Sequence, residues 1–267
     1  MSGGGKSRIA LPAAIVALIA LAALLLPMLL PWSHDAIDWD HVRAAPGTAG
    51  HWLGTDELGR DRLARLAVAT RITLAVALAA ALVSMLVGIG WGMIAGWAGG
   101  RTDELMMRIV DALYALPFMF IVIVLMVVFG RSILLVFVGI GLVEWLTMAR
   151  IVRGQVMVLR HRPFVLAAEA SGAPVRVILA RHILPNIAGV ALAYLTLTLP
   201  GIIMIESFLS FLGLGVQEPL TSLGILVKEG ADDMDVAPMA LLVPGGVMVT
   251  LLVCLTLIGE RLRDRFA

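Results

Sequence analysis

The chain has 267 residues, of which 60% are hydrophobic and 15% charged, and its formal net charge at pH 7 is +1. Soluble domains carry about 25% charged residues, so this composition excludes an ordinary soluble domain, and we expect no nucleic-acid partner. The single cysteine, Cys254, excludes an internal disulfide, and because a lone thiol is not a metal site we expect no bound metal.

Long apolar runs dominate the chain. A hydrocarbon core about 30 Å thick needs about 20 helical residues, and six stretches are candidates: Ile9–Leu30, Ile72–Trp97, Ile109–Phe129, Ser132–Met148, Ile187–Leu212 and Val236–Ile258. A transmembrane β-barrel would show short alternating segments instead. We therefore predict an all-α polytopic membrane protein with six transmembrane helices in the bilayer. Residues 1–71 form an N-terminal helix and external loop, and residues 72–267 form a five-helix core.

The first run could be mistaken for a signal peptide. It is longer than an h-region and no clear small-residue cleavage site follows it, so we expect a retained helix. Excess lysine and arginine marks cytoplasmic segments. Thirteen of the 20 basic residues fall on one predicted side, which holds both termini: Lys6, Arg8, Arg101, Arg108, Arg150, Arg153, Arg160, Arg162, Arg176, Arg181, Arg261, Arg263 and Arg265. Both termini are therefore predicted to be cytoplasmic.

The predicted external loop, residues 31–71, mixes acids with arginines. Asp56 with Arg60, and Asp61 with Arg65, are spaced i,i+4 and could pair on a short helix leading into the second span. Thr55 or Asp56 could cap that helix. The acids lack the alternating spacing of a calcium loop. These charges are therefore expected to be structural.

The cytoplasmic loop, residues 150–186, is the longest polar interruption in the downstream half. Pro163 suits the first turn of a short helix and Gly172 suits its C-terminal cap. Pro174 could open a second helix and Pro185 could end it. Two interpretations remain open from the residues alone: docking to a cytoplasmic partner, or a helix pair lying on anionic lipid.

Two acids, Glu144 and Glu206, lie inside predicted spans. Burial of an ionisable group at membrane depth is costly, so each is a functional hypothesis, here as part of a translocation pathway. The alternative is a structural pair with a partner subunit. Beyond the fifth span, Leu223–Val227 is a candidate re-entrant segment, with Gly224 and Gly230 as hinges.

The chain carries none of the sequence motifs sought for enzymes: no His-Glu-x-x-His, no Gly-x-Ser-x-Gly and no phosphate-binding loop. We therefore expect it not to be an enzyme. A self-contained secondary transporter would need paired repeats around a midplane site, and no convincing repeat is seen. An intramembrane enzyme would need a catalytic nucleophile or a set of metal ligands, and this sequence shows neither.

Four motifs carry a resemblance that covers nearly the whole chain. They are residues 51–61 (His-Trp-Leu-Gly-Thr-Asp-Glu-Leu-Gly-Arg-Asp), 148–155 (Met-Ala-Arg-Ile-Val-Arg-Gly-Gln), 166–172 (Leu-Ala-Ala-Glu-Ala-Ser-Gly, with Leu184-Pro185-Asn186 downstream) and 206–219 (Glu-Ser-Phe-Leu-Ser-Phe-Leu-Gly-Leu-Gly-Val-Gln-Glu-Pro). Together they resemble inner-membrane permease subunits of ABC importers in the dipeptide/oligopeptide/nickel branch, most closely the oligopeptide permease C subunit.

The resemblance implies a type I ABC importer permease fold whose cytoplasmic loop inserts into a groove on a separate ATPase subunit. The implied coupling residues are Phe164, Leu166, Ala167, Ala168, Glu169, Gly172, Leu184 and Pro185. Leu166 occupies the position where the family pattern has glutamate, and Glu169 follows three residues later. Implied residues on the side of the external binding protein are Asp56, Arg60, Asp61, Gln217 and Glu218.

The same resemblance implies the cellular setting. The partners would be a homologous second permease subunit, two ABC ATPases that bind ATP and magnesium, and an external substrate-binding protein, so this chain itself would need no cofactor. The location would be the bacterial cytoplasmic (inner) membrane. The cargo would be oligopeptides, with dipeptides, nickel or glutathione as alternatives.

Overall fold

The computed structural model describes residues 4–130 and 133–266. These residues form helices, turns and isolated β-bridges. The helices are α1 (Gly4–Leu29), η1 (Trp39–His41), α2 (Arg62–Ala98), α3 (Gly100–Tyr114), α4 (Phe118–Phe129), α5 (Ile133–Leu159), α6 (Pro163–Ala170), α7 (Val175–Ile178), η2 (Leu179–Ile183), α8 (Leu184–Phe211), α9 (Leu223–Asp232) and α10 (Met239–Phe266).

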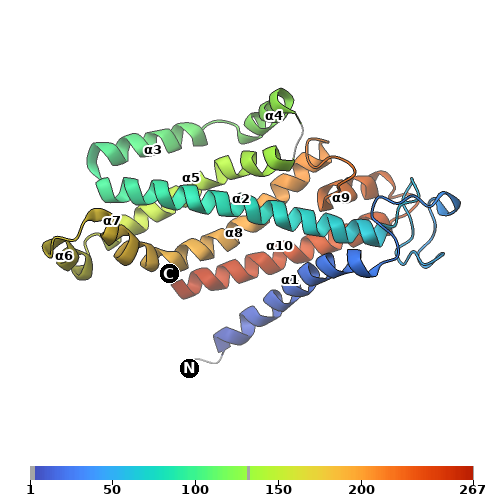
Figure 1. Ribbon diagram of the computed structural model, residues 1–267, viewed down its shortest axis with the longest axis horizontal. Helices are drawn as coiled ribbons and strands as arrows, with labels where there is room; N and C mark the ends of the chain where they lie inside the picture. Colours follow the sequence, from blue (N-terminus) through green and yellow to red (C-terminus); the bar gives the residue numbers. More distant parts are fainter. Residues whose placement is uncertain (1–3, 131–132, 267) are drawn as a thin grey trace.

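The long helices run along one axis of an elongated bundle (Figure 1). The short helices α6 and α7 lie at one end of the bundle, and both ends of the chain lie toward that end. The loop after α1 and the short helix α9 lie at the opposite end. This arrangement agrees with the predicted alternation of loops between the two sides of a membrane.

Within the described parts of the chain, four helices are long and apolar enough to cross a membrane: Ile9–Leu29, Arg62–Ala98, Val175–Phe211 and Met239–Phe266. The 27-residue α5 covers the fourth predicted span; Ser132, where that span was expected to begin, lies outside the described residues. The all-α membrane class is therefore confirmed, although several helices extend beyond the predicted apolar limits.

The third predicted span, Ile109–Phe129, is wrong as a single helix. It divides into α3 and α4 around Pro117, whose ψ of 100° is extended. Proline lacks a backbone N–H and disfavours helical geometry at the preceding residue. The 12-residue α4 measures about 18 Å at 1.5 Å per residue. Because the sequence is apolar on both sides of Pro117, hydropathy alone could not locate this break.

A seam of glycines brings α2 and α5 into close contact. Gly88, Gly92 and Gly96 recur every four residues and share one face of α2. A Cβ atom on Gly92 would lie 2.6 Å from the Ala149 carbonyl oxygen and 2.8 Å from the Val152 Cβ. Small residues at this spacing let helix backbones approach closely in membranes, so the seam sets the distance between the two helices.

Glycines also dock α9 into the bundle. A Cβ on Gly224 would lie 2.5 Å from the Ser207 Cα in α8, and one on Gly230 would lie 2.4 Å from the Ala240 carbonyl oxygen in α10. Both glycines lie inside the helix α9. Their predicted role as hinges is therefore wrong, because they serve as packing points where larger side chains would not fit.

Candidate functional site

The predicted cytoplasmic loop contains the expected short helix, α6, with Pro163 in its first turn. The helix ends in a Schellman motif. The Gly172 N–H donates to the Glu169 carbonyl oxygen at 2.9 Å, and the Ala173 N–H donates to the Ala168 carbonyl oxygen at 3.1 Å. Gly172 adopts a φ of +76°, which glycine accepts without a steric penalty. The predicted cap is therefore confirmed.

The predicted end of the second helix at Pro185 is wrong. Residues Leu179–Ile183 form a π-helical turn that connects α7 to α8 without a break. The Leu184 N–H donates to the Leu179 carbonyl oxygen, five residues back. Pro185 follows in the first turn of α8. The wider turn accommodates a proline that would clash with a regular α-helix carbonyl.

α6 divides its side chains between the bundle and the outside. Val165 is fully buried and Ala168 packs against the core, which anchors the helix. The other predicted coupling side chains in α6 are exposed: Phe164, Leu166, Ala167 and Glu169. Leu184 and Pro185 are also exposed. Leu166 and Glu169 lie three residues apart and so share one face, where both side chains are open to a partner.

Three arginines near this loop bond within the chain. Arg160 donates to the Trp97 carbonyl oxygen at 3.0 Å and so binds the C-terminal end of α2. Arg153 makes two charge-assisted hydrogen bonds to Asp103 in α3, and Arg150 pairs with Asp111 at 2.7 Å. The basic character of this end therefore has a structural component that joins α2, α3 and α5.

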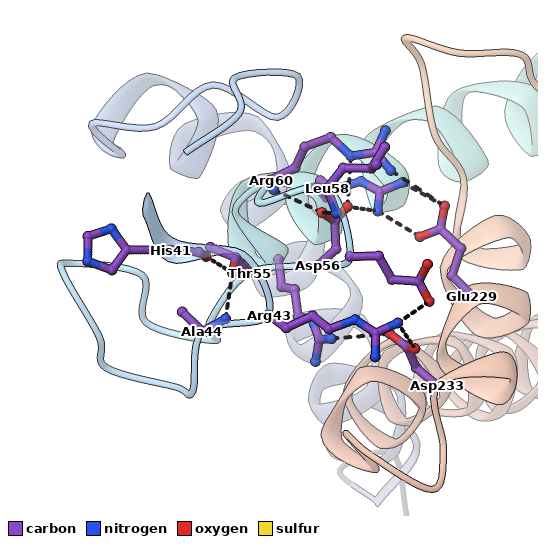
Figure 2. Close-up of polar contacts among 12 residues, drawn as sticks. His41, Arg43, Ala44, Thr55, Asp56, Leu58, Arg60, Glu229 and Asp233 are labelled. Atoms are coloured by element: carbon purple, nitrogen blue, oxygen red, sulfur yellow. Dashed lines mark hydrogen bonds and ion pairs between the residues drawn. The ribbon is translucent and has the colours of Figure 1, made fainter. Parts of the chain in front are cut away.

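Asp56 is the centre of an ionic network at the opposite end (Figure 2). Its carboxylate accepts from the Arg60 backbone N–H at 2.9 Å, from Arg60 Nε at 2.7 Å and from Arg65 Nη1 at 2.6 Å. Burial by itself raises the pKa of Asp56, but these hydrogen bonds and the two guanidinium charges outweigh it, so its pKa lies below the ordinary value. Asp56 is therefore an ionised hub.

The network ties the loop after α1 to the segment around α9. Arg65 holds both carboxylate oxygens of Glu229, at 2.6 and 2.9 Å, and Arg60 pairs with Glu218 at 2.8 Å. Asp233 lies 3.4 Å from Arg43 and 3.5 Å from Arg62 (Figure 2). Contacts separated by about 160 residues in the sequence thus hold the turn after α8 against the loop, and α9 against the first turn of α2.

Two local predictions about this loop need correction. Arg65 pairs with Asp56 and Glu229 rather than with Asp61. Asp61 is instead the N-cap of α2, accepting from the Ala64 N–H at 2.7 Å, so the cap lies later than Thr55 or Asp56. The segment 52–60 consists of turns rather than a helix, because the helix begins at Arg62.

A buried histidine completes this cap. His51 is fully buried, with Nδ1 2.8 Å from Asp61 Oδ2 and Nε2 3.4 Å from Asp38 Oδ2. The Trp32 ring stacks on the imidazole at 4.4 Å between centroids. The arrangement links the chain after α1 to the start of α2. Within the described residues, no group of three or more His, Cys, Asp or Glu side chains could hold a metal ion.

The remaining predicted external residues lie in the turn after α8. Gln217 is exposed and its amide donates to the Gly215 carbonyl oxygen at 3.0 Å. Glu218 is exposed as well and reaches Arg60. The structure therefore joins Asp56, Arg60 and Glu218 in one network, with Asp61 and Gln217 outside it.

Glu206 is fully buried in a cluster of hydroxyl groups. Its carboxylate accepts from Ser210 Oγ at 2.7 Å and from Thr73 Oγ1 at 3.2 Å. Ser222 donates to Ser210 at 3.1 Å, and the Leu223 N–H donates to Thr73 Oγ1 at 3.1 Å. Side chains of this chain therefore supply the partners that the structural alternative assigned to another subunit. The pathway role of Glu206 stays a prediction.

Glu144 has a different environment. It lies in the middle of α5 and is half-buried. Among the ion pairs and hydrogen bonds of the described residues, none involves its carboxylate. Its pathway role also stays a prediction. Sequence reasoning missed the burial of His51 and the true partner of Arg65, although both lie in or beside the 51–61 motif, and it missed the roles of Glu229 and Asp233 altogether.

Comparison with known proteins identifies the family. Residues 88–267 match the model of the family described as "Binding-protein-dependent transport system inner membrane component". The chain belongs to this family. The match includes α6, the π turn and Glu206, and its N-terminal limit lies within α2 at the first glycine of the seam. This inner membrane component is therefore a multi-pass permease subunit of an ABC importer family, and the resemblance noted in its sequence is confirmed.

Curated relatives cover most of the chain. It is 48% identical over 251 residues to the oligopeptide transport system permease protein OppC of Escherichia coli K12, covering 94% of this chain and 83% of that protein. It is 40% identical over 250 residues to OppC of Bacillus subtilis 168, covering 94% and 82%. It is 45% identical over 185 residues to the dipeptide transport system permease protein DppC of B. subtilis, covering 69% and 58%.

Proposed function

We propose that this chain is a permease subunit of an ATP-driven, binding-protein-dependent importer of oligopeptides. The observation that carries the proposal is the exposed, proline-started and glycine-capped α6, anchored between α5 and the continuous α7–α8 rod. Such a helix suits insertion into a groove of another protein. The similarity of the whole chain to permeases named for oligopeptide transport supports oligopeptides as the cargo.

The proposed complex contains a homologous second permease and two ABC ATPases, which bind ATP and magnesium. Phe164, Leu166, Ala167 and Glu169 of α6 would contact the ATPase, while Gly172 keeps the helix end in shape. Leu184 and Pro185 border that contact. Both termini would then be cytoplasmic, in a bacterial inner membrane, because they lie toward the α6 end of the bundle (Figure 1).

The ionic network at the other end would face an external substrate-binding protein. Asp56, Arg60 and Glu218 tie the loop after α1 to the turn after α8, so docking on either segment would act on both. Asp61 and Gln217 shape the adjoining turns. ATP binding to the partner ATPases would supply the differential affinity that shifts the permease between its outward and inward openings.

Reconstitution tests the function. The chain would be co-expressed with its companion permease, ATPases and binding protein and incorporated into proteoliposomes, where uptake of a labelled oligopeptide is measured. We expect ATP-dependent uptake that requires this chain. A chain that purifies alone and transports peptide without an ATPase would refute the proposal and favour a secondary transporter.

A dipeptide importer is the second candidate, because the chain is also similar to a permease named for dipeptide transport. The affinity of the companion binding protein for dipeptides, longer peptides, nickel and glutathione discriminates these cargoes. Tight binding of peptides of four or more residues is the result expected for the first candidate.

A further inference from the structure

One face of α5 carries three polar side chains, Glu144, Thr147 and Gln155, interspersed with two aliphatic ones. At 3.6 residues per turn, five residues on this helix share one face at i, i+3, i+7, i+11 and i+14: Glu144, Thr147, Ile151, Gln155 and Val158. All five are half-buried or exposed in the chain. The neighbouring face, which carries Met148, Val152 and Val156, is buried against the glycine seam of α2. The polar stripe therefore lies beside the seam and remains open.

The exposed faces of other spans suit lipid. On α10 the large exposed residues include Leu242, Val249, Val253 and Leu257, and on α2 they include Leu78, Leu82 and Leu86. Glu144 follows Ile133 by eleven residues, about 17 Å along the axis, which is close to the middle of a 30 Å core. A carboxylate in lipid at that depth is costly. The stripe therefore faces protein or water.

The nearest basic residues on α5 already have partners. Arg150 pairs with Asp111, and Arg153 pairs with Asp103. Within residues 4–130 and 133–266, no ion pair or hydrogen bond to Glu144 is formed. The described residues therefore supply no cation to this carboxylate, which leaves it free to pair with one from another molecule.

We propose that Glu144 binds the N-terminal ammonium group of a peptide in transit, with Thr147 beside it on the same face. The inference rests on the proposed function. Every linear peptide with a free amino terminus carries this cation whatever its side chains, so a carboxylate at mid-depth provides a handle that does not depend on sequence. The rival is a cation of the companion permease that pairs with Glu144 permanently.

The test uses the assembled complex without binding protein, so that the binding protein's own preference does not enter. Thr147→Cys is introduced into a Cys254→Ala background, since Cys254 is the single native cysteine. Labelling by a small maleimide is then measured against increasing concentrations of a tripeptide or its N-acetylated form. The same titrations are repeated with Glu144→Gln and with Glu260→Gln, a control that removes an exposed acid of α10 with no proposed role.

We expect the free-amine tripeptide to protect the introduced thiol at a concentration about tenfold lower than the acetylated form, which corresponds to about 1.4 kcal/mol. Glu144→Gln should abolish this difference, and Glu260→Gln should retain it. Equal protection by the two peptides, absence of protection, or a thiol that does not react would each overturn the inference. Lower complex yield for Glu144→Gln with an unchanged protection difference would support the companion pair instead. Uptake by the native complex is measured separately, so failure here leaves the proposed function intact if uptake persists.

Discussion

The α2–α5 seam allows a comparison between two glycines only two residues apart. A Cβ on Gly92 would lie 2.6 Å from the Ala149 carbonyl oxygen, whereas one on Gly90 meets nothing within 4 Å. Gly92→Ala therefore forces the helices apart. Overpacking of this kind costs about 1–3 kcal/mol, and a gap of about 0.5–1 Å forfeits about a quarter to a half of each lost dispersion contact.

Gly90→Ala has the opposite expectation, because alanine favours a helix over glycine by about 1 kcal/mol and no neighbour is displaced. Both variants would be unfolded by increasing SDS mole fraction in mixed micelles. The Trp91 and Trp145 rings, 5.1 Å apart across the seam, give a local fluorescence signal. Both variants share the gain in helix propensity, so we expect Gly92→Ala to be less stable than Gly90→Ala by about 1–3 kcal/mol and to unfold at lower SDS. Equal midpoints for the two variants would refute the seam as the determinant of helix spacing.

Three further predictions concern the two ends of the bundle. Gly172→Val places a β-branched residue at φ +76°, at a cost of about 1–3 kcal/mol, and should weaken ATPase association. Gly172→Asn, which tolerates this φ, should retain that association. Equal co-purification of the ATPase with both variants would contradict the role of the cap. Leu166→Ala should weaken ATPase association more than Glu169→Ala does, by up to about 1.5–3 kcal/mol if the groove buries the leucine. Titration of the ATPase onto the permease pair measures both affinities. A larger loss for Glu169→Ala would indicate a polar contact instead. Because the pKa of Asp56 lies below its ordinary value, its stabilising contribution is complete above the unfolded pKa of about 3.9 and is lost as pH falls through the folded value. As the pH falls below about 3.9, the free energy of unfolding of the wild type should therefore decrease more steeply than that of Asp56→Asn. Parallel plots of unfolding free energy against pH for the two proteins would contradict this prediction.

Features specified by neighbouring residues were predictable from the sequence. Pro163 and Gly172 mark the two ends of α6 through their own backbone preferences, and the apolar runs identify the long helices. The Asp56–Arg60 pair follows from i,i+4 spacing, although its backbone forms turns rather than a helix. Each of these predictions depends on the local sequence alone.

Features that depend on tertiary register were not predictable. Arg65 could have paired with either nearby aspartate, and only the docking of α9 brings Glu229 within reach. Glu206 bonds to Ser210 one turn later on its own helix, but its other partner, Thr73 on α2, lies 133 residues away in the sequence. Pro185 was expected to end a helix because the tolerance of a π turn for proline depends on the surrounding fold.

The uninterrupted helix from Val175 to Phe211 has a mechanical consequence. Its 37 residues form a rod about 55 Å long. One end follows directly from α6, and the other carries Glu206 and the hydroxyl cluster that holds α9. We therefore expect a tilt imposed on α6 to displace the far end of the rod in the opposite direction about a pivot in the bundle. The two surfaces of the membrane are then joined by covalent chain, and a stroke at one reaches the other without a relay of side chains.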